Sequence, residues 1–178
     1  MAFNASSVAP RDAGTGTNGT VDLGASSARF KDLYLSGGVY LGGTGSANKL
    51  DDYEVGTFTP IVFGSTTTGA ATYTIQSGRY TKVGNKVFIE IVLGWSAHTG
   101  AGALRINGLP FTCNGTRQTF SILAENLTYT GELKALSATG SSNDLWLFNQ
   151  SSASGLSIVN LDTNVSYMVI TGGYITNS

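Results

Sequence analysis

The chain has 178 residues and a formal net charge of −1 at neutral pH, and only 12% of its residues are charged. Its Lys and Arg residues are scattered singly, whereas nucleic-acid-binding proteins usually carry a basic patch or stripe. The same scatter disfavours an anionic membrane surface as a partner. No apolar run approaches the roughly 20 residues that a transmembrane helix requires. We therefore expect neither a nucleic-acid partner nor membrane insertion.

The composition predicts an all-β protein. Hydrophobic residues make up 41% of the chain, and 24 residues are Gly. A surface with so few charges must be covered by Ser, Thr, Asn and Gly, which suit strands joined by tight turns. Stretches rich in Ala, Leu, Glu and Lys, which favour helices, are almost absent.

Residues 1–19 are rich in small and polar residues without periodicity, and they predict a flexible or anchoring arm. The first ten residues have neither the basic nor the apolar region of a signal peptide, so synthesis in the cytoplasm is expected. Residues 14–19 formally fit G-x-G-x-x-G, but a dinucleotide site needs a helix directly after the glycines. No helical pattern follows, so we interpret this match as chance.

Residues 20–50 contain an alternating pattern of apolar residues, typical of short strands with one buried face. Leu33, Leu35, Val39 and Leu41 share one parity in this segment. A few strands of this length cannot bury a core alone. We therefore predict an intertwined β stalk in which other copies of the chain cover this apolar row. The absence of heptads excludes a coiled-coil stalk.

Residues 44–56 form a polar connector, and we place the start of a globular head at residue 51. Asp51, Asp52 and Glu54 cluster here, and hard cations such as calcium bind several carboxylate oxygens. The spacing is not that of an EF-hand loop. We favour a solvated hinge and expect no metal.

Residues 51–178 are predicted to form an antiparallel, jelly-roll-like β-sandwich, because short strands and turn signals follow one another at regular spacing. Pro60 marks the first strand as an edge strand or a bulged one. A hairpin is expected at Gly84 and Asn85, both in left-handed conformations. The expected strands are 57–63, 71–82, 86–95, 103–107, 118–126, 132–137, 145–150, 156–161 and 165–175.

One strand of this hairpin has a fully apolar face. Alternate residues of the 86–95 strand are apolar, so we expect them to lie in the core. These core residues are Val87, Ile89, Ile91, Leu93 and Trp95.

Several motifs, in a fixed order, resemble the C-terminal part of bacteriophage tail fibres. Residues 21–39 (VDLGASSARFKDLYLSGGV) resemble a repeat near the ends of these fibres. Residues 50–60 (LDDYEVGTFTP) and 77–88 (SGRYTKVGNKVF) resemble the entry to their globular domain, and 106–111 (INGLPF) a turn within it. The likeness extends from residue 20 to residue 112. It departs from the family at Val55, where an acidic residue is expected, and at Phe58, where Trp is expected.

The resemblance implies a homotrimeric fibre tip of a virion, which joins other virion proteins through its N-terminal arm and attaches to a host surface glycan or protein. A capsid-associated head fibre or decoration protein is the alternative, because a chain of this length beginning at Met1 is short for a whole tail fibre; a fragment is also open. A small hydrolase is a third, disfavoured class.

Four residues are candidates for receptor contact: Tyr129, Trp146, Asn149 and His98. Sugar-binding sites stack sugar rings on aromatic side chains beside Asn, Asp and Gln, a mixture found in residues 144–150 (DLWLFNQ). Trp146 and Phe148 share one face of this strand, and core or trimer packing is the favoured interpretation for them. His98 falls in a predicted loop, where we favour an exposed turn residue over a ligand contact.

No catalytic residue or cofactor is predicted. His98 is the only histidine, so neither a His-rich metal site nor a Ser-His-Asp triad with a spare histidine can form. Cys113 is the only cysteine, and we expect it to be a small buried apolar residue. Glycan hydrolysis needs a positioned pair of carboxylates, and the sequence favours no such pair.

Overall fold

The structure, a computed structural model, describes residues 11–12, 15–16, 19, 21–140, 142–151 and 155–177. Backbone contacts divide the chain into two compact units, Met1–Gly37 and Gly38–Ser178. The three-part division into 1–19, 20–50 and 51–178 stays a prediction. In the first unit, β1 (Arg11–Asp12) pairs antiparallel with β2 (Thr15–Gly16). Most of the predicted arm lies outside the described residues.

The segment with the alternating apolar pattern forms turns, bends and irregular loops, with almost no strand pairing. An isolated bridge between Ala25 and Ala28 is its only pairing over residues 21–38, all of which are described. The short strand β3 (Val39–Tyr40) pairs with β4 (Lys49–Leu50) across a 3-10 turn, η1 (Ser46–Asn48). The strands expected between residues 20 and 38 are thus not formed in the single chain. A strand needs a partner for its backbone hydrogen bonds, and one chain supplies none here.

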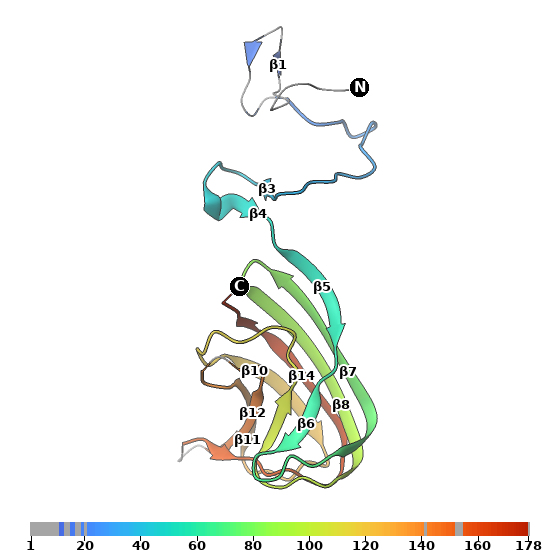
Figure 1. Cartoon of the computed structure of the whole chain (residues 1–178), viewed down its shortest axis with the longest axis vertical. Helices are drawn as coiled ribbons and strands as arrows, with labels where there is room; N and C mark the ends of the chain where they lie inside the picture. Colours follow the sequence, from blue (N-terminus) through green and yellow to red (C-terminus); the bar gives the residue numbers. More distant parts are fainter. Residues whose placement is uncertain are drawn as a thin grey trace. The chain divides into compact units, whose positions relative to one another are not determined.

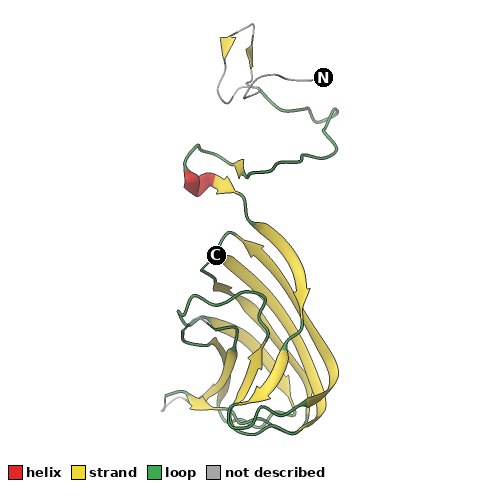
Figure 2. Ribbon diagram, viewed as in Figure 1, coloured by secondary structure: helices red, strands yellow, loops and turns green. Residues whose placement is uncertain are grey.

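The head confirms the all-β prediction. Its described residues form one antiparallel sheet in the order β5-β7-β8-β14-β10-β11-β12-β9-β6, with β13 paired to β12. The sheet curls, so that β10, β11 and β12 lie across from the long curved strands β7 and β8 (Figures 1 and 2). The sandwich-like core is therefore enclosed by two halves of one sheet. The strands are β5 (Tyr53–Phe58), β6 (Ile61–Gly64), β7 (Ala71–Val83), β8 (Lys86–His98), β9 (Leu104–Asn107), β10 (Thr119–Glu125), β11 (Glu132–Ser137), β12 (Leu145–Gln150), β13 (Ser157–Ile158) and β14 (Val165–Ile175).

The predicted apolar face of β8 lies in the core. All five of its residues, from Val87 to Trp95, are at most 4% exposed. Trp95 is fixed further by its indole N–H, which donates to the carbonyl oxygen of Asp162 at 3.0 Å. Leu145 and Leu147 of β12 belong to the same core cluster. The period-2 pattern thus identified the core face correctly.

The turn between β7 and β8 differs from the expected one. Gly84 has a φ of +57°, but Asn85 does not have a positive φ. Among the described residues, Asn126 is the only non-glycine with a positive φ. A two-residue type II′ turn needs a positive φ only at its first central position, which Gly84 occupies. The prediction for Asn85 was therefore wrong.

Strand bounds are correct for the 132–137, 145–150 and 165–175 segments. The expected 57–63 strand is divided, because β5 ends at Phe58 and β6 begins at Ile61, with the buried Pro60 between them. Pro has no N–H for a ladder hydrogen bond, which explains the break. β5 also begins inside the expected connector, at Tyr53, since it pairs with β7 there.

Tyr174 joins β14 to the loop before β10. Its side chain is fully buried, and its hydroxyl donates to the Phe111 carbonyl oxygen at 3.0 Å and accepts the Phe111 N–H at 3.2 Å. Burial raises the pKa of the Tyr174 phenol above its ordinary value of 10.0. The folded state therefore favours the neutral phenol, and the associated stability is present below pH 10 and lost as the pH rises above it.

We expect Tyr174→Phe to lower the free energy of unfolding at pH 7 by about 1–3 kcal/mol, because both Phe111 backbone groups lose their partner. The variant should also lose less stability than the parent between pH 9 and pH 11. Urea denaturation across this pH range measures both effects. Tyr53→Phe, at a side chain that is 65% exposed, is the matched control. Identical pH profiles for parent and Tyr174→Phe would contradict the assignment.

Candidate functional site

The predicted stalk row is exposed in the single chain. In the first unit, Leu33 and Leu35 are 64% and 52% exposed. In the second unit, Val39 and Leu41 are 36% and 57% exposed. Burial of apolar surface is favourable by a free energy of about 25 cal/mol per Å². These side chains therefore favour association with a surface that covers them.

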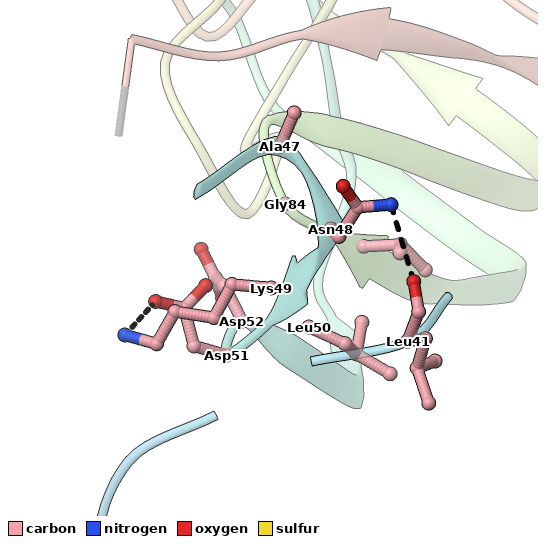
Figure 3. Close-up of a pocket in the computed structure, with 9 residues that line it drawn as sticks. Leu41, Ala47, Asn48, Lys49, Leu50, Asp51, Asp52 and Gly84 are labelled. Carbon is pink, nitrogen blue, oxygen red and sulfur yellow. Dashed lines mark hydrogen bonds and ion pairs between the residues drawn. The ribbon is translucent and has the colours of Figure 1, made fainter. Parts of the chain in front are cut away.

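The β3–β4 hairpin lines a cavity of about 350 Å³ beside the β7–β8 turn (Figure 3). The Asn48 side-chain amide donates to the Leu41 carbonyl oxygen at 3.1 Å, and the Lys49 ammonium lies 2.8 Å from the Asp51 carboxylate (Figure 3). The hydrogen bond from Lys49 to the Asp51 carboxylate, together with the charge of Lys49, holds the pKa of Asp51 below its ordinary value. The Gly84 N–H donates to the Asp52 carbonyl oxygen at 2.8 Å, which ties the hairpin's exit to the head.

The acidic cluster does not converge on one point. Asp52 forms an ion pair with Lys82, whose side chain is almost fully buried, and Glu54 accepts a hydrogen bond from the Tyr80 hydroxyl. Asp51 pairs instead with Lys49. Within the described part of the chain, no three His, Cys, Asp or Glu residues gather in a way that could hold a metal ion. Instead of a solvated hinge, this segment is attached to β7 by polar contacts.

His98 is not an exposed turn residue, and that expectation was wrong. β8 continues three residues beyond Trp95, and His98 at its end is only 6% exposed. The Gly100 N–H donates to Nδ1 at 2.8 Å, and Nε2 lies 3.1 Å from the Val62 carbonyl oxygen. Nδ1 is therefore the acceptor and Nε2–H the donor, so both nitrogens hold the chain and neither faces a receptor.

The other predicted receptor residues do not form one site. Trp146 and Asn149 are an odd number of residues apart on β12, so they point to opposite faces of the sheet. The Asn149 amide donates to the Thr130 hydroxyl at 3.4 Å, which brings Asn149 to the loop that carries Tyr129. Tyr129 is 39% exposed. Trp146 belongs to a different surface.

Two arginines that sequence reasoning missed lie against the aromatic pair on β12. The Arg105 guanidinium carbon is 4.5 Å from the Trp146 ring centroid, and that of Arg117 is 5.6 Å from the Phe148 centroid. The two ring centroids are 6.4 Å apart. A cavity of about 160 Å³ lies among these four side chains and is also lined by Ile158. No local pattern pairs these residues, because Arg105 and Arg117 come from segments far from β12 in sequence.

The outer face of the sheet carries a second set of apolar residues that sequence reasoning did not assign to assembly. Leu123, Val169 and Val92 are cross-strand neighbours on β10, β14 and β8. Leu123 is 57% exposed, and Phe88, on the same face of β8 as Val92, is 51% exposed. The available signal was the apolar character of Phe88 and Val92 at the even positions of β8.

Comparison with known proteins shows the fold but not the family. No protein-family model and no curated protein matched the chain. Among solved structures, the crystal structure of the Dettilon tailspike protein is similar, with a TM-score of 0.53 and 17% identity. The match covers 69% of this chain and 23% of the tailspike chain. At this identity, the two proteins share a fold over that region.

A membrane-spanning helix is not found among the described residues, since none of their helical segments is long and apolar enough.

Cys113 is buried, as expected, at 1% exposure. Burial raises the pKa of its thiol to about 11, so almost no thiolate is present at neutral pH.

We expect Cys113 to resist a thiol-reactive disulfide reagent at pH 7.5 and to react fully once the protein is unfolded in guanidinium. Absorbance of the released thiolate measures the reaction. Rapid modification of the folded protein would contradict a purely structural role for this cysteine.

Proposed function

We propose that this chain is a structural protein of a phage particle, a trimeric tail fibre or fibre tip that attaches to a host surface receptor, with a glycan as the preferred receptor. The observation that carries this proposal is the fold shared with part of a phage tailspike protein. The sequence motifs of the stalk and of the head entry point in the same direction.

The trimer is supported by uncovered apolar surface. Leu33 and Leu41 belong to a row that the described part of one chain leaves exposed. The same segment carries the alternating pattern of strands but forms almost none in one chain. Three copies would supply both the missing hydrogen-bond partners and the cover for the row. Three weak receptor sites on one tip would then bind with avidity.

A non-enzymatic role is supported by the contacts that several candidate carboxylates make within the chain. Asp144 accepts a hydrogen bond from the Asn107 amide at 2.6 Å, and Glu132 lies 2.6 Å from the Lys134 ammonium. Asp162 accepts the Thr128 N–H. These groups hold loops and strands in place. We therefore propose attachment without glycan cleavage.

The second candidate is a capsid-associated head fibre or decoration protein. The structural match covers only 23% of the tailspike chain, so it does not say which part of a particle carries this chain. In either case, other virion proteins are the proposed partners of the N-terminal arm.

The purified protein should have a mass in light scattering of about three times 18.5 kDa. The double variant Leu33→Asp/Val39→Asp should be a monomer, because buried charges without partners are costly. The double variant Ser36→Asp/Thr44→Asp adds the same charge to exposed positions of the same segment and should stay trimeric. A folded monomer for the parent protein would overturn the proposed stalk.

Attachment and location can be separated in one set of experiments. We expect the trimer to adsorb to intact host cells and to appear at the tail in antibody-labelled electron micrographs of the particle. Co-sedimentation with empty capsids that lack tails would support the decoration protein instead. Turnover of a host polysaccharide, lost on changing one carboxylate, would contradict the non-enzymatic role.

A further inference from the structure

We propose that the cavity formed by Arg105, Arg117, Trp146 and Phe148 binds a carboxylate-bearing sugar unit of an acidic saccharide. This inference rests on the proposed attachment function and names the chemistry of the receptor.

The cavity lies where β12 changes its neighbouring strand. Trp146 is paired with Arg105 of β9, whereas Phe148, two residues on, is paired with Ile158 of β13. Between them, the Val159 N–H donates to the Leu147 carbonyl oxygen at 3.2 Å, and the Leu104 N–H donates to the Val159 carbonyl oxygen at 2.8 Å. The sheet thus divides at this point. The outward side chains on either side of the division enclose a space of about 160 Å³.

The charge at this cavity is positive and unbalanced. All ion pairs in the described part of the chain involve lysines, so neither Arg105 nor Arg117 is paired with a carboxylate there. The cation–π contacts with Trp146 and Phe148 hold each guanidinium near an aromatic ring, and its N–H donors can still bond to a ligand. Two arginines held in this way favour an anion with a planar pair of oxygens, because a guanidinium binds a carboxylate through two parallel hydrogen bonds.

The rest of the cavity favours a sugar over a bare anion. Leu104 and Ile158 provide apolar walls, and the Trp146 and Phe148 rings add aromatic surface. The volume equals roughly five water molecules, so it suits one sugar unit.

Two pairs of probes separate the carboxylate from the sugar ring: galacturonate with galactose, and glucuronate with glucose. Tryptophan fluorescence reports binding, because Trp95 is fully buried and Trp146 lines the cavity. For at least one pair, we expect a saturable change with the uronate and at least tenfold weaker binding of the neutral sugar. Raising the salt concentration should weaken the uronate but not the neutral sugar.

Variants of the full-length protein test the residues. Arg117→Gln, at an exposed side chain, should weaken uronate binding at least tenfold without unfolding the head. Arg105→Lys keeps the charge but loses the planar fork, so we expect severalfold weaker binding. Arg79→Gln removes the same charge from an exposed position of β7, outside the cavity lining, and should bind as the parent does.

Equal binding of uronates and neutral sugars, or unchanged uronate binding in Arg117→Gln, would overturn the inference. Inorganic phosphate that binds as tightly as the uronate would also overturn it, because the cavity would then be a simple anion site. The absence of binding by either uronate would overturn it as well. Adsorption to host cells distinguishes the two levels of the proposal. If Arg117→Gln adsorbs as well as the parent, the cavity assignment fails and the attachment function stands. If the parent does not adsorb, the attachment function itself fails.

Discussion

The whole structure depends on the requirement that strand backbones find hydrogen-bond partners. In the head, the 13-residue strands β7 and β8 satisfy each other and offer their outer edges to β5 and β14. The sheet then continues to β6 and curls over its own apolar face. The segment around Leu33 has a strand-like pattern but no such neighbour, so in one chain it stays unpaired and exposed. The same constraint explains a head that folds on itself and supports the proposed stalk, in which other copies of the chain would supply the missing partners.

Polar side chains fix the parts that the ladders do not hold. Lys82, buried and 5.4 Å from the Phe111 ring, pairs with Asp52 and so joins the start of the head to β7. Tyr174, which shares the cross-strand neighbour Val87 with Lys82, holds the Phe111 backbone. Removal of one partner from such a buried pair strongly destabilises the fold. These pairs therefore favour one arrangement of the loops over others.

The surface chemistry of the head follows from the curl of the sheet. Inward positions of β12 fill the core, and its outward positions hold Trp146 and Phe148 under two arginines. His98 shows the opposite case, in which a candidate ligand contact is consumed by the fold. A polar residue is available for recognition only when the tertiary structure leaves its donors or acceptors unused.

By itself, the sequence determined the all-β class, the core face of β8 and the bounds of β11, β12 and β14, because local alternation and turn residues encode them. The apolar row that includes Leu33 and Leu41 stays a prediction of the sequence, because residues of one parity share a face only where the chain forms a strand. Only the tertiary structure decided the burial of His98, because β8 continues beyond Trp95 and both ring nitrogens contact the backbone of other segments. It also decided that Arg105 meets Trp146, because the pairing of β12 with β9 joins segments that are far apart in sequence and has no local signal.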